Sequence, residues 1–155
     1  MPGPMLDGVK VLDLTRMLAG PFGSMLLAHL GADVVKIEPP GGDEVRGLPP
    51  EAYAGIGAYF FSANRGKRSV VIDLESDAGR ELLYRLAREA DVVFYNYRAG
   101  VAKRLGIDAE SLHRVNPRLI VCSLTGFGED GPWAERPSYD LVIQALSGAM
   151  SLTGE

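Results

Sequence analysis

Residues 8–14, GVKVLDL, are followed by a helical segment at 21–30, PFGSMLLAHL, and by a second apolar run at 33–38, DVVKIE. Both runs are short and rich in Val, Leu and Ile, as strands buried on both faces of a sheet are. Pro21 suits the first turn of the helix between them, and Gly31 suits its end. A strand, a helix and another strand in this order predict a βαβ unit with two parallel strands.

The same alternation continues along the chain. Further strands are expected at 69–74, 91–97 and 118–124, and further helices at 76–90, 108–116 and 141–150. Residues 39–57 contain several Pro and Gly and predict a long surface loop. We therefore predict an α/β fold, a Rossmann-like open parallel sheet with helices on both faces.

Local signals define two of these helices. Ser76 or Asp77 can cap the first, and Asp108 can cap the second. The helix that follows Ser76 should place Glu81 and Arg85 on its outer side, at the spacing of an ion pair. Its apolar face is expected to consist of Leu82, Leu83, Leu86 and Ala90.

The composition restricts the class of protein. The chain has 155 residues, 46% of them hydrophobic, and a formal net charge of −4. This hydrophobic fraction excludes a disordered chain, and no apolar run approaches the roughly 18 residues of a membrane span. The acidic balance argues against DNA or RNA as a partner, because nucleic-acid binding needs a basic face. A single cysteine excludes a disulfide framework and fits a reducing cytoplasm, where we expect the protein to act.

Basic residues gather where this fold places its ligands. In an open parallel sheet the binding crevice lies outside the carboxyl ends of the strands. Windows 53–71 and 93–106 contain no acidic residue. They hold six of the sixteen basic residues: Arg65, Lys67, Arg68, Arg98, Lys103 and Arg104. The last three follow a predicted strand and suit an anion, particularly phosphate, while Tyr95 or Tyr97 could lie along a flat ring. Two solvated basic loops are the alternative.

Other chemistries have less support. The first turn lacks a G-x-G-x-x-G pattern, and Pro21 removes an amide that a pyrophosphate would use, which disfavours a nicotinamide-dependent oxidoreductase. Only Glu38, at the end of its strand, resembles a ribose-binding acid. Cys122 lies between apolar neighbours and is expected to be a small buried side chain. His29 and His113 have no ligand spacing, so no metal site is predicted.

Asp140 follows a loop rich in Gly and Pro and begins an apolar helix. It can cap that helix, or it can place a carboxylate at the mouth of the crevice. Both roles are compatible.

Several longer stretches together resemble the family III CoA-transferases, the group of formyl-CoA transferase, carnitine CoA-transferase and α-methylacyl-CoA racemase. They are LDGVKVLDLTRMLAGPFGSMLLAHLGADVVKIEPPGGDEVR (6–46), NRGKRSVVIDLESDAGRELL (64–83), ADVVFYNYRAGVAKRLGID (90–108), NPRLIVCSLTGFGEDGP (116–132) and YDLVIQALSG (139–148). Family members are more than twice as long. The resemblance therefore implies that residues 1–155 are the N-terminal, CoA-binding part of a larger domain.

The resemblance also implies an activity. It is the transfer of CoA from an acyl-CoA thioester to a carboxylic acid through an aspartyl-CoA intermediate, in an interlocked homodimer. Coenzyme A is then a substrate, with no permanently bound cofactor. The nucleophilic aspartate is expected beyond residue 155, so this chain alone should be inactive. The implied CoA contacts are Met17, Leu18, Ile72, Asp73, Leu74, Glu75, Asn96, Tyr97, Arg98 and Arg104, with Tyr139 and Asp140 as active-site wall.

The chain departs from the family pattern at three positions. Pro39 stands where many members have an arginine, and Pro137 where some have a lysine, which leaves more of the phosphate binding to Arg98 and Arg104. Tyr139 matches the catalytic histidine of the racemase. A phenol, which titrates at about pH 10, is a poor base for an α-proton. We expect Tyr139 to pack beside the following helix or to line the acyl pocket.

Transferase is therefore favoured over racemase. The remaining alternative is a fragment that binds CoA or another nucleotide without catalysis. The sequence leaves the donor thioester and the acceptor acid open.

Overall fold

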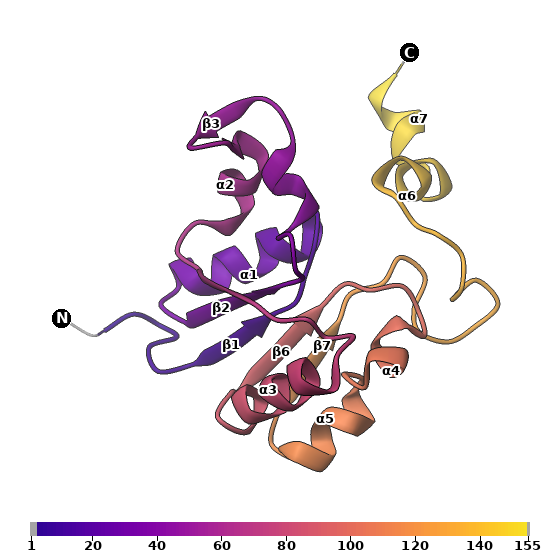
Figure 1. Cartoon of the computed structure of the whole chain (residues 1–155). Helices are drawn as coiled ribbons and strands as arrows, with labels where there is room; N and C mark the ends of the chain where they lie inside the picture. The colour runs from indigo at the N-terminus through magenta and orange to yellow at the C-terminus, as the bar shows by residue number, and fades with distance from the viewer. Residues whose placement is uncertain (1–2, 155) are drawn as a thin grey trace.

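The computed structural model describes residues 3–154, and its centre is a parallel sheet of five strands in the order β5-β2-β1-β6-β7 (Figure 1). These strands are β1 Lys10–Asp13, β2 Asp33–Glu38, β5 Arg68–Val71, β6 Val92–Tyr95 and β7 Ile120–Ser123. Every neighbouring pair is parallel. The predicted open parallel α/β sheet is confirmed. Strand β2 has the predicted bounds, and the other four strands are shorter than predicted.

Helices lie on both sides of this sheet (Figure 1). Helices α1 (Ala19–His29) and α2 (Ala58–Asn64) pack together on one side. Helices α3 (Asp77–Arg88), α4 (Val101–Leu105) and α5 (Ala109–Val115) pack on the other. The last two helices, α6 (Asp140–Leu146) and α7 (Ala149–Thr153), stand away from the sheet beyond a long connection.

The larger core lies between the sheet and helices α3 to α5. Leu12, Val93 and Tyr95 point into it from the strands and meet Leu83 and Leu112 from the helices. Because side chains alternate along a strand, the residues between them face α1. Val11 and Val34 form the second cluster there, packed against Leu27.

The order of the strands creates a switch point. The chain leaves β1, adds β2 and β5 on one side, and then returns through α3 to place β6 on the other side of β1. The connections that follow β1 and β6 therefore run to opposite faces of the sheet, and a crevice forms between them. This is the position expected for the ligand site.

The predicted helix caps are confirmed. The Ser76 hydroxyl accepts a hydrogen bond from the Gly79 amide at 3.0 Å, and the Asp108 carboxylate accepts one from the Ser111 amide at 3.3 Å. The predicted ion pair of Glu81 is wrong, because its carboxylate lies 3.6 Å from Arg88 instead of beside Arg85. Leu82, expected on the apolar face, is 40% exposed.

The loop predicted at 39–57 has more structure than expected. It contains a 3-10 turn, η1 (Glu44–Gly47), and a hairpin of β3 (Glu51–Tyr53) and β4 (Ile56–Gly57). Helix α2, which follows directly, has no start signal in its sequence. It is stabilised by tertiary contacts, since it packs on α1 and its Phe60 ring lies 3.8 Å from the Arg46 guanidinium.

The helix predicted at 141–150 is interrupted. Gly148 has a φ of 79°, a left-handed conformation that ends α6 and separates it from α7. The residue at the cap position of α6 is Tyr139, and Asp140 is the first helical residue. The predicted capping role of Asp140 is therefore wrong, and its carboxylate instead accepts a hydrogen bond from Gln144.

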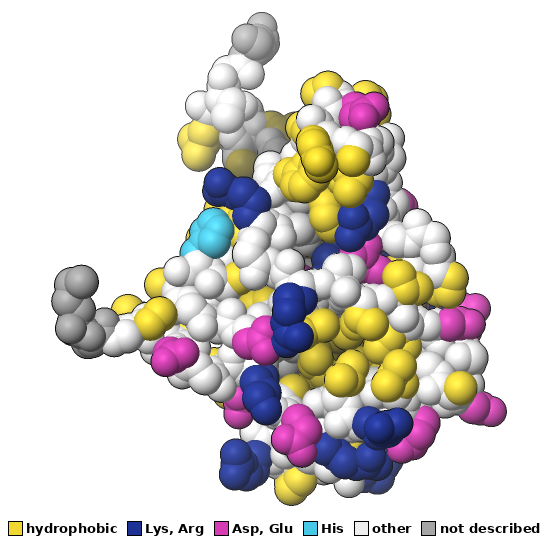
Figure 2. All heavy atoms as spheres, turned by 60° about the vertical axis from the view of Figure 1, so that its left-hand side comes forward, with side chains coloured by type: hydrophobic (Ala, Val, Ile, Leu, Met, Phe, Trp, Pro, Cys, Tyr) yellow, Lys and Arg dark blue, Asp and Glu magenta, His cyan; other side chains and the backbone are white. Residues whose placement is uncertain are grey.

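Cys122 is exposed, so its predicted burial is also wrong. Strand β7 is at the edge of the sheet, and no described helix covers the face that carries Cys122 and Ile120, which is 63% exposed. Elsewhere charges of both signs lie between patches of hydrophobic side chains on the surface (Figure 2). Within residues 3–154, no helix has the length and apolar character needed to cross a bilayer.

Candidate functional site

A pocket of about 1380 Å³ opens at the carboxyl end of the sheet. It is lined by residues that follow each of the five strands of the sheet, together with the start of α6. The structure brings all ten predicted CoA contacts into its lining: Met17, Leu18, Ile72, Asp73, Leu74, Glu75, Asn96, Tyr97, Arg98 and Arg104. Tyr139 and Asp140, the predicted wall residues, also line it.

The turn after β1 is held by buried charges. Asp13 accepts hydrogen bonds from the Thr15 amide at 3.0 Å and from the Thr15 hydroxyl. The other oxygen of Asp13 accepts from Ser24 at 2.7 Å and from the Lys67 ammonium at 2.8 Å. The Lys36 ammonium donates to the Thr15 carbonyl at 2.8 Å. Each polar group of Thr15 is thus bonded to a buried side chain just before the chain enters the pocket.

Lys36 also forms a buried ion pair. Its ammonium lies 2.8 Å from the Asp43 carboxylate, and both side chains are almost fully buried. Buried charges are costly without a partner. The pair joins β2 to the segment before η1, behind the pocket wall.

Glu38 is fully occupied by partners within the chain. It forms two hydrogen bonds with the Arg46 guanidinium, at 2.7 and 2.6 Å, and accepts from the Asp43 amide and the Ser69 hydroxyl. Burial raises the pKa of this carboxyl, but these hydrogen bonds outweigh burial and lower the pKa to about 2. Its oxygens are therefore not free to bind a ribose, which further disfavours the nicotinamide alternative.

In the folded chain, acidic side chains from other segments lie next to basic residues of both windows. Lys67 is paired with Asp13 in the interior, and Arg68 is paired with Asp33 at 2.6 Å on the surface. These two basic residues of the first window are therefore already paired with carboxylates of the chain. Burial lowers the pKa of Lys67, although the neighbouring Asp13 raises it in part. In the second window, Arg98 and Arg104 do line the pocket.

Only one of the two tyrosines in this region is available to a ligand. Tyr95 is 2% exposed and belongs to the core. Tyr97 stacks on it, with ring centroids 5.9 Å apart and planes at 19°, and presents its other side to the pocket. Burial raises the pKa of the Tyr97 hydroxyl, and the charge of Arg16 lowers it in part.

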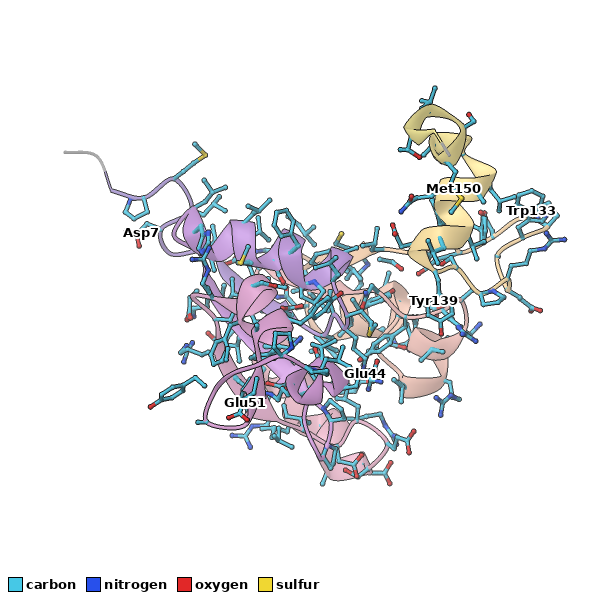
Figure 3. All side chains as sticks on the ribbon, turned by 90° about the horizontal axis from the view of Figure 1, so that it is seen from above. Asp7, Glu44, Glu51, Trp133, Tyr139 and Met150 are labelled. Carbon is cyan, nitrogen blue, oxygen red and sulfur yellow. The ribbon has the colours of Figure 1, made fainter. Side chains whose placement is uncertain are left out.

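The wall opposite the sheet is formed by the segment that leads to α6. Figure 3 shows Tyr139 at the base of the C-terminal helices, where they join the rest of the molecule. Its side chain is 64% exposed, so the predicted packing beside α6 is wrong, whereas it does line the pocket.

Sequence reasoning missed several pocket residues, among them Arg16, Tyr59 and Arg136. Arg16 follows β1 directly, and its place beside Met17 could have identified it. Tyr59 belongs to α2, which had no sequence signal, and Arg136 lies over the Trp133 ring at 4.7 Å in the connection before α6. In the described part of the chain, no group of three or more His, Cys, Asp or Glu side chains could hold a metal ion.

The fold and this pocket define a parallel α/β protein with a large site at its switch point, bordered by arginines and tyrosines. Residues 6–155 match the sequence profile of the CoA-transferase family III, and the chain belongs to that family. The resemblance inferred from the sequence is confirmed.

Several named relatives are similar over nearly the whole chain. The succinate–glutarate CoA-transferase of Agrobacterium fabrum is 47% identical over 98% of this chain, and the acetyl-CoA:oxalate CoA-transferase of Acetobacter aceti is 48% identical over 98%. The succinyl-CoA:mesaconate CoA-transferase of Haloarcula hispanica is 47% identical over 97%. The chain spans 40%, 39% and 40% of the lengths of these relatives.

Solved structures agree with the fold. A CAIB/BAIF family protein from Brucella suis has a TM-score of 0.94 at 49% identity, covering 99% of this chain and 42% of that one. A Mycobacterium tuberculosis protein has a TM-score of 0.89 at 41% identity, covering 96% of this chain and 41% of that one.

Proposed function

We propose that the full-length protein transfers CoA from an acyl-CoA thioester to a carboxylic acid, and that residues 1–155 supply its CoA-binding part. The observation that carries this proposal is the pocket, where ten residues from the segments that follow β1, β5 and β6 meet. Membership of the family supports the same reaction.

In this proposal, Arg98 and Arg104 bind the phosphates of CoA. Arg98 has no ion pair among residues 3–154, and Arg104 lies 3.7 Å from Glu75, with both side chains mostly exposed. An exposed pair of this kind is weak, so a phosphate can replace Glu75. Tyr97 offers a flat ring, and Met17, Leu18 and Leu74 offer apolar surface to the rest of the molecule.

The chemistry requires a carboxylate nucleophile, which the resemblance places beyond residue 155. That carboxylate attacks the donor thioester and expels CoA as a thiolate, forming a mixed anhydride. The thiolate then attacks the anhydride at the enzyme's carbonyl, which releases the donor acid and leaves CoA on the enzyme. The acceptor carboxylate attacks this thioester, and the same steps in reverse deliver CoA to it. The residues of this chain hold CoA throughout and perform no covalent step.

We further propose that the acceptor is a dicarboxylic acid. The names of the relatives mention succinate, glutarate, oxalate and mesaconate, each of which carries two carboxylates. We also propose that the full-length protein is a homodimer, as the resemblance implies. The exposed apolar side chains of Ile120, Leu141 and Leu146 support this, because such surface is usually covered by a partner.

The binding proposal is tested by removing the two arginines. In the full-length protein, Arg98→Ala with Arg104→Ala should weaken CoA binding by about 1.5–3 kcal/mol or more, because charged hydrogen bonds to phosphate are lost. Isothermal titration with CoA measures the change. Arg114→Ala is the matched control, since Arg114 is as exposed as Arg104 and also pairs with a glutamate, but lies on α5 outside the pocket. Unchanged affinity in the double variant would contradict the proposal and favour the alternative, in which the basic segments are solvated loops that bind no phosphate.

A further inference from the structure

Arg16 is the first residue of the pocket turn, and its backbone is fixed to the neighbouring strand end. Its amide donates to the Asn96 side-chain oxygen at 2.7 Å, and its carbonyl accepts from the Asn96 side-chain nitrogen at 2.8 Å. The Asn96 amide therefore spans the switch point between β1 and β6. Because both the oxygen and the nitrogen of this side-chain amide bond to the Arg16 backbone, the main effect of Asn96 is to fix this turn.

The residues on either side restrict the turn further. Thr15 is bonded through its amide, hydroxyl and carbonyl to Asp13 and Lys36. Met17 has a φ of 65°, a conformation that is uncommon for a residue with a side chain. Such a conformation persists where its surroundings impose it. Arg16 thus projects from a rigid, preorganised turn.

The charge of Arg16 has no acidic partner in the part of the chain that the structure describes. Its guanidinium lies 5.7 Å from the centroid of the Tyr97 ring, within the pocket lining. By contrast, Arg46, Arg68 and Arg104 each have a carboxylate within 4.0 Å. An arginine whose backbone is fixed at a pocket and whose charge has no acidic partner is suited to an anionic group of the substrate, and its planar fork matches a carboxylate.

Resting on the proposed function, we propose that Arg16 determines acceptor specificity by binding the second, non-reacting carboxylate of a dicarboxylic acid. One carboxylate of such an acid must be free to attack the enzyme thioester, while the other keeps its charge inside the pocket. A buried or partly desolvated carboxylate needs a cation. Arg98 and Arg104 are assigned to the phosphates of CoA, and the guanidinium of Arg136, the remaining arginine of the lining, lies over the Trp133 ring at 4.7 Å. Arg16, whose turn is fixed between two strand ends, is therefore assigned to the second carboxylate.

The test compares matched acids in the full-length protein, with acetyl-CoA as the donor because its acyl group has no second carboxylate. Succinate is compared with butyrate, and glutarate with pentanoate, pairs that differ in that one group. Arg16→Met, which keeps an apolar stem, should lower kcat/KM for the dicarboxylates by about 10- to 100-fold and leave the monocarboxylates unchanged. Arg16→Lys should restore part of the loss. Arg114→Met is the control and should change neither.

Each other outcome overturns the inference in a recognisable way. An equal loss for both kinds of acid, with a raised KM for acetyl-CoA, means that Arg16 binds a CoA phosphate instead. If the wild-type protein uses butyrate as efficiently as succinate, it has no preference for dicarboxylic acids and the inference is wrong. The proposed transferase function would still stand. Absence of CoA transfer to any of the four acids, with succinyl-CoA as well as acetyl-CoA as the donor, removes the proposed function and this inference together.

Discussion

At the scale of single residues, the site depends on charges that are buried in pairs. Asp13 is paired with Lys67, Asp43 with Lys36, and Glu38 with Arg46. Removing one member of a buried pair leaves its partner without compensation, which is costly in the low-dielectric interior. These pairs surround the turn after β1, so they stabilise the fold and position the pocket.

Glu38 should make stability depend on pH in the acid range. Its pKa is lowered from 4.5 to about 2 in the folded protein, so its stabilising contribution is present above pH 4.5 and is lost as the pH falls toward 2. The shift corresponds to a contribution on the order of 3 kcal/mol. Urea unfolding at pH 7, 4.5 and 3 should show this loss. Glu38→Gln should be less stable at pH 7 and show a shallower decline.

The control for this prediction is Glu110→Gln, which removes an exposed carboxylate from a surface ion pair. Surface pairs contribute little, so this variant should follow the wild-type curve. A Glu38→Gln variant with the full acid-dependent decline would show that another group causes it.

Tyr139 should not act as a base. It is 64% exposed and lies directly before α6 in the pocket wall. With the full-length protein and a 2-methylacyl-CoA in deuterated water, α-deuterium should not enter at a catalytic rate, because a phenol is a weak base at neutral pH. Mass spectrometry of the thioester measures incorporation. Rapid incorporation that disappears in Tyr139→Phe would identify a racemase with an unusual base.

At the scale of elements, close contacts between helices and turns define the pocket edges. Gly20, in the first turn of α1, lies against the Thr15 side chain, and an added Cβ there would overlap it. At the other edge, Gly79 in α3 lies against the Asp73 carbonyl, in the segment that lines the pocket. Both helices can approach the pocket turns because glycine has no side chain.

The cap of α3 provides a test at this scale. Ser76→Ala removes the hydrogen bond to the Gly79 amide and should lower the free energy of unfolding by about 1 kcal/mol. Urea unfolding at pH 7 measures the change. Ser62→Ala is the control, because Ser62 is an exposed residue within α2 whose hydroxyl bonds only to a backbone carbonyl. Equal effects of the two changes would contradict a specific capping role.

At the scale of the whole molecule, coverage of the sheet is unequal. Helices α3 to α5 cover one face, whereas α1 lies over β1, β2 and β6 and leaves its side of β7 open. Ile120 and Cys122 lie on that open side. This is why a strand with a nearly continuous apolar sequence is not buried on both faces.

Cys122 reports on this open face, and it is the single cysteine of the chain. Because it is exposed, this chain should take up one equivalent of a thiol reagent under native conditions. Its rate should be close to that of the chain unfolded in guanidinium chloride. Absorbance during reaction with an aromatic disulfide follows the labelling. Reaction only after denaturation would mean that the face is covered.

The amino-acid sequence was sufficient to predict the parallel α/β fold, a helix cap at Ser76 or Asp77 and another at Asp108, and segments that line the pocket. These features depend on local chemistry, since apolar runs, turn residues and cap side chains act within a few residues of each other. The stretches that carry the family resemblance include these same segments. They follow the strands, so they lie together at the carboxyl edge of the sheet.

Tertiary contacts determine which charged side chains have no internal partner, and these contacts could not be predicted from local sequence. Lys67 and Arg68 are basic in a window without acids, yet Asp13 and Asp33 reach them from strands 54 and 35 residues away. In the same way, Cys122 is exposed because β7 is an edge strand, and Arg16 is available because its turn is fixed by Asn96, 80 residues later. Pairing and burial depend on which segments become neighbours in space, and a parallel sheet joins residues that are far apart in the chain.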